Sequence, residues 1–67
     1  MIAEAIAARE GLIFASFLEV KNLLVEGDSL NLIHMIKREV NVDNSVEVIV
    51  EHIRRMACNF CFVCICV

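Results

Sequence analysis

The chain has 67 residues, enough for one small domain or a piece of a larger one, because compact domains usually contain about 100–150 residues. Hydrophobic residues make up 60% of the sequence, above the roughly 45–50% of a typical soluble domain, so the chain has more apolar surface than its length readily buries. Nine acidic and six basic residues give a net charge of −3, which excludes a strong overall attraction to nucleic acid.

The apolar runs are too short to cross a membrane. The longest, 12–18 and 60–67, fall below the roughly 18–20 residues that a spanning helix needs. The N-terminus has Glu4 and no basic stretch before its apolar residues, so it does not resemble a secretory signal. We expect an intracellular, non-secreted protein, in either the nucleus or the cytoplasm. Its excess of apolar residues then indicates an oligomer or a core that continues into further segments.

The first half of the chain predicts a helix, a strand and a second helix. Periodic apolar residues indicate a helix from Ile2 to about Leu18, and a β-type run over Asn22 to Glu26 ends in a Gly-Asp-Ser turn signal. Ser29 is expected to cap the second helix, which stops around Glu39 to Asn41. The first helix is expected to present an apolar face of Ile2, Ile6, Ile13 and Phe17.

The second half predicts a helix and a strand. Asn44, followed three residues later by Glu47, resembles a capping box, so a third helix is expected from Ser45 to about Ala57. The uncharged tail from Asn59 to Val67 predicts a strand covered on both sides. The order helix, strand, helix, helix, strand predicts an α/β fold with parallel strands and an incomplete sheet, because two strands and three helices bury this much apolar surface poorly.

The four cysteines, all in the last ten residues, allow two interpretations. Their spacing, C-x-x-C-x-x-C-x-C, is compatible with zinc binding. On a strand, however, Cys64 and Cys66 face one side and Cys61 the other, which prevents one tetrahedral site from collecting them all. We therefore predict that Cys58, Cys61, Cys64 and Cys66 are reduced, buried thiols.

The other polar candidates are interpreted as residues on solvent-facing helix surfaces. His34 and His52 lie beside charged residues on the expected polar faces, so we interpret them as solvated and not as ligands or bases. The basic residues that could contact a phosphate backbone also complete amphipathic helices, which is the simpler explanation; they are Lys37, Arg38, Arg54 and Arg55.

Two motifs carry a resemblance to a known family. Ala3-Glu4-Ala5 opens a helix that continues through Gly11-Leu12, and Asn22-Leu-Leu-Val-Glu-Gly-Asp-Ser29 follows as strand and turn. In this combination the chain resembles the ribonuclease H-like domain associated with reverse transcriptases and common in plants. The resemblance covers essentially all 67 residues, and the Val25–Ser29 turn downstream of Glu4 is its most specific part.

The resemblance implies a metal-dependent nuclease site. Glu4 and Asp28 match two of the family's four catalytic, magnesium-binding carboxylates, and the implied partner is an RNA–DNA hybrid recognised by shape. The other two aspartates have no counterpart in residues 1–67, so we expect a partial domain that lacks the N-terminal strands and the C-terminal helix. The sequence leaves open whether the chain is an enzyme, and we expect weak Mg²⁺ binding and no activity of this fragment by itself.

Alternatives without catalysis remain. The chain can be a non-catalytic remnant, for example from a retroelement-derived gene, that acts as a nucleic-acid-binding or interaction module. It can also be a small oligomer that pairs an exposed strand edge with another copy.

Overall fold

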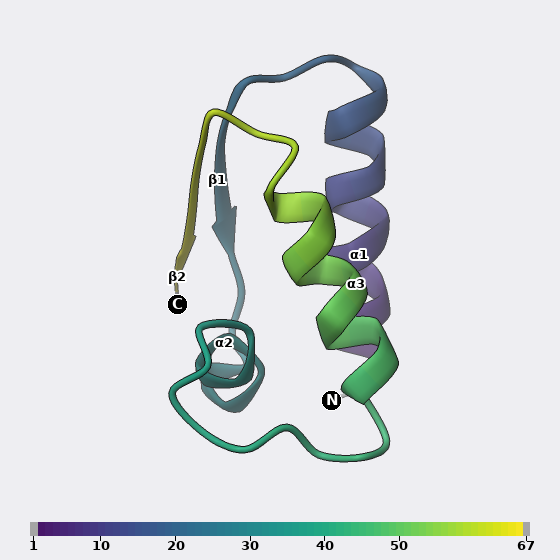
Figure 1. Ribbon diagram of the computed structural model, residues 1–67, viewed down its shortest axis with the longest axis vertical. Helices are drawn as coiled ribbons and strands as arrows, with labels where there is room; N and C mark the ends of the chain where they lie inside the picture. Colours follow the sequence, from purple (N-terminus) through teal and green to yellow (C-terminus); the bar gives the residue numbers. More distant parts are fainter. Residues whose placement is uncertain (1, 67) are drawn as a thin grey trace.

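A computed structural model describes residues 2–66 and shows the α/β architecture that the sequence predicts (Figure 1). Two strands, β1 (Asn22–Glu26) and β2 (Phe62–Cys66), form a parallel sheet with a register from Asn22 opposite Phe62 to Glu26 opposite Cys66. The elements follow one another as α1 (Ile2–Phe17), β1 (Asn22–Glu26), α2 (Leu30–Ile36), α3 (Glu47–Ala57) and β2 (Phe62–Cys66).

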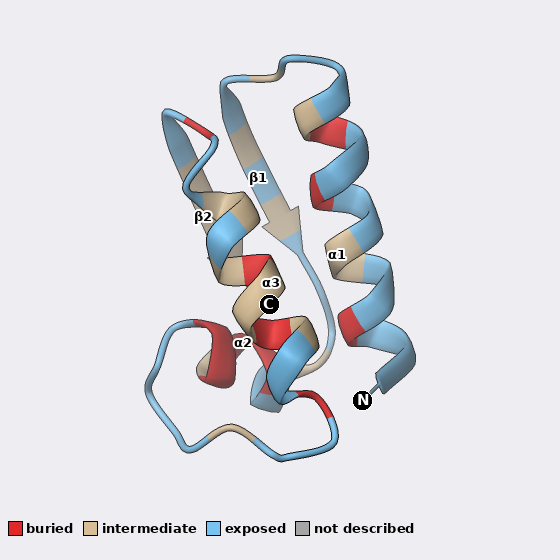
Figure 2. Ribbon diagram, turned by 45° about the vertical axis from the view of Figure 1, so that its right-hand side comes forward, coloured by how far each residue is buried: buried red, intermediate tan, exposed pale blue. Residues whose placement is uncertain are grey.

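The core lies between the sheet and a layer of two helices. Helices α1 and α3 lie side by side over one face of the sheet, and α2 sits beyond the carboxyl ends of the strands (Figures 1 and 2). The most deeply buried large side chains belong to Leu12, Val46, Val50 and Ile53. The sheet adds partly buried side chains to this cluster from alternate strand positions, Leu23, Val25, Val63 and Ile65.

Helix α1 buries a different face from the one the sequence predicts. Ala5, Leu12 and Ala15 are in the core, whereas the expected face is largely exposed, from 37% at Ile13 to 81% at Phe17. Small side chains let α1 approach α3 closely, so packing between the helices decides which face is buried. Apart from Leu12, the large apolar side chains of α1 are exposed, including Phe14 at 64%.

Both α1 and α2 end in Schellman motifs built on residues other than glycine. Glu19 (φ 61°) and Arg38 (φ 64°) adopt the left-handed conformation. At each end the amide of the following residue reaches back five positions, with Val20 donating to Ala15 at 3.1 Å and Glu39 to His34 at 2.9 Å. Helix α2 therefore ends at Ile36. The predicted end was later because the apolar pattern continues past this point and no glycine marks the end of the helix.

Helix α3 begins at Glu47, two residues later than predicted, and has no capping box. Val46 is its N-cap and makes no side-chain capping hydrogen bond. The preceding turn is organised instead by Asp43, whose carboxylate accepts hydrogen bonds from the Ser45 amide and hydroxyl, both at 3.0 Å. These bonds hold the pKa of Asp43 below its usual value, with the Ser45 amide as the main cause.

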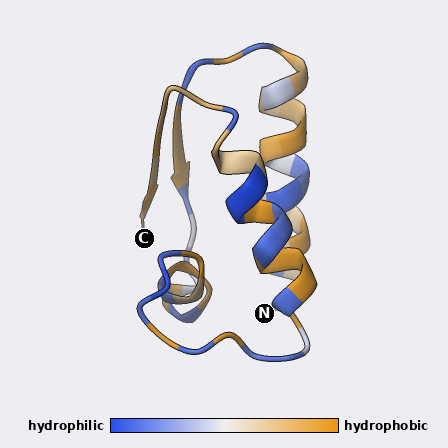
Figure 3. Ribbon diagram, in the orientation of Figure 1, coloured by the Kyte–Doolittle hydropathy of each residue, from blue (hydrophilic) through white to orange (hydrophobic). Residues whose placement is uncertain are grey.

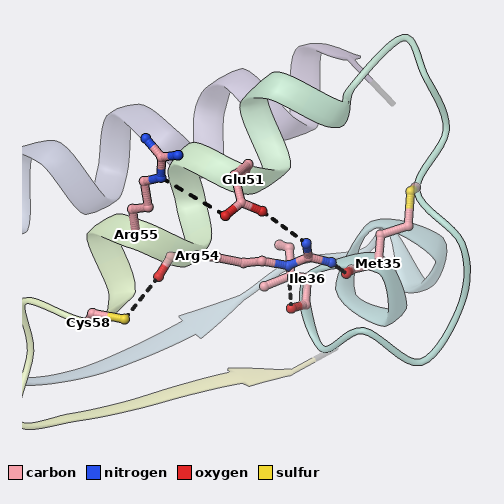
Figure 4. Close-up of polar contacts among 6 residues, drawn as sticks. All are labelled: Met35, Ile36, Glu51, Arg54, Arg55 and Cys58. Carbon is pink, nitrogen blue, oxygen red and sulfur yellow. Dashed lines mark hydrogen bonds and ion pairs between the residues drawn. The ribbon is translucent and has the colours of Figure 1, made fainter.

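Arg54 fastens α3 to the end of α2 (Figure 4). Its guanidinium donates to the carbonyl oxygens of Met35 and of Ile36, the latter at 3.3 Å, and to the Glu51 carboxylate at 3.2 Å. The Arg54 side chain is only 15% exposed, so the prediction that it faces solvent is wrong. A cation at the last carbonyls of a helix satisfies groups that the helix itself leaves unpaired.

Strand β2 begins at Phe62, three residues later than predicted, and it is more open than predicted. The predicted end of this strand, Val67, lies outside the described residues. The strand spans Phe62–Cys66, preceded by the buried Phe60, and it is hydrophobic along its length (Figure 3). Its second face is not covered, because Phe62 is 62% exposed beside Leu24 at 60%. Among residues 2–66, none of the helices combines the length and apolar character that a membrane span requires.

Candidate metal-binding site

Asp28 lies immediately beyond the carboxyl end of β1. The Gly27 amide donates to the Cys66 carbonyl oxygen at 3.0 Å, which continues the parallel ladder one residue past the strand. Ser29 then takes an extended conformation (φ −95°, ψ 95°) as N-cap of α2, and its hydroxyl accepts from the Leu32 amide at 3.4 Å. Asp28 is therefore held between a strand end and a helix start, with its side chain exposed.

Glu4 reaches the same end of the molecule from α1. It lies in the first turn of this helix, and α1 runs in the opposite direction to β1 (Figure 1). From Glu4 to Phe17 the helix rises about 20 Å at 1.5 Å per residue, and from Lys21 to Asp28 an extended chain spans about 23 Å at 3.3 Å per residue. These nearly equal lengths return the chain to the level of Glu4.

Glu4 and Asp28 line the same open, polar pocket of about 390 Å³. Ser29, Leu30 and Asn31 complete its wall. The structure thus brings the two carboxylates predicted from the sequence to one place, although they come from different elements. Both are exposed and retain access to solvent.

A larger apolar cleft of about 440 Å³ opens beside this pocket and shares Glu4, Asp28 and Ser29 with it. The cleft lies between α1 and β1, where the small residues Ala7, Ala8 and Gly11 leave room. Its lining also includes Glu26, a third acidic residue that the sequence analysis assigned only to the strand. Leu24 and Glu26 lie on the exposed face of β1 and alternate with Leu23 and Val25, which pack against the core. This alternation was the available signal that Glu26 faces away from the core.

The donor set suits a hard divalent cation. Carboxylate oxygens are the protein ligands that Mg²⁺ prefers, and this ion is often held by one or two carboxylates while water or phosphate oxygens complete its octahedron. Among residues 2–66, no group of three or more His, Cys, Asp or Glu side chains is arranged to hold a metal. Glu4 and Asp28 therefore fit as a two-carboxylate site, not as a closed protein cage.

The cysteines are not the buried thiols that the sequence predicts. Cys58 and Cys61 are exposed, and Cys64 and Cys66 are half-buried. The expectation of burial assumed a strand covered on both faces, whereas one face of β2 is open. Partial burial, reinforced by the neighbouring Cys64, raises the pKa of the Cys66 thiol.

The histidines lie away from the carboxylate pair. His34, partly exposed, contacts the Glu39 carboxylate through Nδ1 at 2.9 Å beside the Schellman turn of α2. His52 is half-buried on α3. Neither lines the pocket that contains Glu4 and Asp28.

A family model described as reverse transcriptase-like matches residues 1–65. No curated protein and no solved structure matches the chain significantly.

Proposed function

The chain belongs to the reverse transcriptase-like family, whose domain is of ribonuclease H-like type, and from this premise we propose that Glu4 and Asp28 form part of a magnesium site directed at an RNA–DNA hybrid. The observation that carries the proposal is the shared pocket of these two carboxylates. The family typically uses a divalent metal. The carboxylate oxygens of Glu4 and Asp28 are hard ligands of the kind that Mg²⁺ prefers.

The roles of the chain's own residues follow from their positions. Glu4 presents its carboxylate from the first turn of α1. Asp28 presents its carboxylate from the turn between β1 and α2, which the Ser29 cap holds in place. Bound magnesium would supply charge neutralisation at a phosphate and activation of water. The open pocket leaves space for a phosphodiester to complete the coordination.

The charge of the chain should make hybrid binding depend on magnesium. A net charge of −3 and two carboxylates at the site repel a polyanion. We expect that the chain binds a hybrid weakly in chelator and more tightly in Mg²⁺. We also expect no cleavage by this chain alone, because two carboxylates hold magnesium loosely and position a second ion poorly.

The test compares wild type with Asp28→Asn and Glu4→Gln in fluorescence anisotropy with a labelled RNA–DNA hybrid. Glu47→Gln is the matched control, because Glu47 is also an exposed acid in the first turn of a helix. Mg²⁺ should strengthen binding to wild type and the control but not to the two site variants. Equal Mg²⁺ dependence in all four proteins would refute the proposal. Magnesium-dependent cleavage that disappears in Asp28→Asn would overturn the expected inactivity.

An interaction module without catalysis is the second candidate. The exposed apolar side chains of Leu24 and Phe62, which lie diagonally across the open sheet face, favour it. An interaction role requires neither Mg²⁺ nor Asp28. Partner binding that is identical in chelator and in Asp28→Asn would support this candidate over the first.

A further inference from the structure

Strand β2 has one edge that no other described residue pairs with. Within residues 2–66, β2 pairs only with β1, and no other element is drawn along its outer side in either view (Figures 1 and 2). The Cys66 carbonyl oxygen accepts from Gly27 and so points toward β1. Because strand residues alternate, the amides and carbonyls of Val63 and Ile65 point outward.

This edge lacks the features that usually prevent strands from pairing. No residue from Met56 to Val67 is charged, and the chain contains no proline. Charged side chains, proline and covering loops are the common protections of an exposed edge. An isolated pair of strands is also marginally stable, so added strand pairing is favourable.

We propose that β2 pairs antiparallel with β2 of a second copy of this chain, around a two-fold axis at Cys64. This register places Val63 opposite the partner's Ile65, where the outward amides and carbonyls form reciprocal hydrogen bonds, and Phe62 opposite the partner's Cys66. Every facing side chain is uncharged and apolar, so the edge is complementary to itself.

The free edge of β1 suits a second copy less well. It contains Glu26, and a charged side chain on an edge strand is one of the common protections against pairing with another chain. Helix α1 also flanks it, because α1 and β1 line the same cleft. The symmetric contact is therefore assigned to β2.

The proposed register makes a geometric prediction for Cys64. It faces its own symmetry mate in a non-hydrogen-bonded pair, with Cα atoms about 4.5 Å apart. That separation lies within the range that a disulfide spans. The proposal develops the interaction role and involves neither Glu4 nor Asp28, so its failure leaves the metal-site proposal untouched.

The first experiment is sedimentation equilibrium of the reduced chain over a range of concentrations. Because the contact is small, we expect a weak dimer with a Kd of about 10⁻⁴ M. With rising concentration, the apparent mass should increase from 7.6 kDa toward twice that value. Cys64→Lys should remain monomeric, because it places two like charges at the axis. Cys58→Lys, a matched control at an exposed cysteine outside the strand, should dimerise like wild type.

The second experiment traps the pair covalently and does not depend on the lysine variant folding. Three chains each retain a single cysteine, Cys64, Cys66 or Cys58, with serine at the others. Oxidised glutathione is the oxidant: one Cys64 thiolate displaces a glutathione thiolate to form a mixed disulfide, and the partner's Cys64 thiolate then displaces the second. Two protein thiols are oxidised and one glutathione disulfide is reduced to two thiols.

The expected result is that the chain with Cys64 alone gives a disulfide-linked dimer on a non-reducing gel several-fold faster than the other two. A wild-type chain that stays monomeric at the highest concentration would overturn the proposal. Equal trapping through Cys58 or Cys66 would overturn it as well, since only the proposed register brings Cys64 to its mate.

Discussion

Replacing Arg54 by methionine should destabilise the protein by about 2–3 kcal/mol. The arginine donates to two carbonyls at the end of α2, and each hydrogen bond from a charged donor contributes about 1.5–3 kcal/mol when well buried. The sum for two such bonds is about 3–6 kcal/mol. Because the side chain is 15% exposed and partly solvated, we expect a loss of stability below this sum. Methionine keeps most of the apolar stem in place, which isolates the loss of the guanidinium.

Arg55→Met is the matched control for this prediction. Arg55 is 78% exposed and only approaches Glu51, at 4.0 Å, so its loss should cost less than about 0.5 kcal/mol. Urea denaturation followed by circular dichroism gives both free energies of unfolding. A domain of this length has a total stability of about 3–10 kcal/mol, so the midpoint for Arg54→Met should shift clearly. Equal midpoints for the two variants would refute the role of Arg54.

Three further predictions follow from other contacts. Arg38→Gly should raise the melting temperature, corresponding to about 0.5–1 kcal/mol, because glycine adopts its left-handed conformation without strain; an unchanged melting temperature would contradict this. Ser45 lowers the pKa of Asp43 in the folded protein. The ionised carboxylate therefore stabilises the fold above the unfolded pKa, and this stabilisation is lost as the pH falls through the lower folded pKa. Asp43→Asn should therefore lose less stability than wild type in thermal melts between about pH 5 and pH 2, and parallel losses would argue against it. Burial raises the pKa of the Cys66 thiol, so Cys66 should react with iodoacetamide more slowly than exposed Cys58 near neutral pH. Mass spectrometry measures both rates, and equal rates would contradict the raised pKa of Cys66.

Local sequence signals predict those parts of the fold that local interactions determine. Strand β1 has the predicted bounds, because its apolar run ends at a Gly-Asp-Ser turn whose serine does cap α2. The parallel pairing of the strands also follows from the order of elements. In these regions propensity and tertiary structure agree.

Tertiary contacts decide the parts that the sequence analysis misjudged. The buried face of α1 depends on how closely α3 approaches, so Ala5 and Ala15 are buried instead of the larger Ile13. The stop of α2 at Ile36 depends on a left-handed Arg38, which carries no sequence signal comparable to glycine.

In the candidate site, too, one part follows from local sequence signals and another from tertiary contacts. Asp28 could be located from its strand-to-helix turn alone. Its proximity to Glu4 depends on tertiary structure, because the segments Glu4–Phe17 and Lys21–Asp28 run in opposite directions over nearly equal lengths. The polar neighbour Asn31 could not be assigned, because its place at the pocket requires the orientation of α2.

The most direct test of the central claim is a titration of the ¹⁵N-labelled chain with Mg²⁺, followed by NMR. If Glu4 and Asp28 hold the ion together, the amide signals of residues 3–5 and 27–31 should shift along one saturating curve. Either Asp28→Asn or Glu4→Gln should abolish the shifts at both segments, while Glu47→Gln leaves them unchanged. Shifts at only one segment, or shifts that survive both substitutions, would contradict a shared magnesium site.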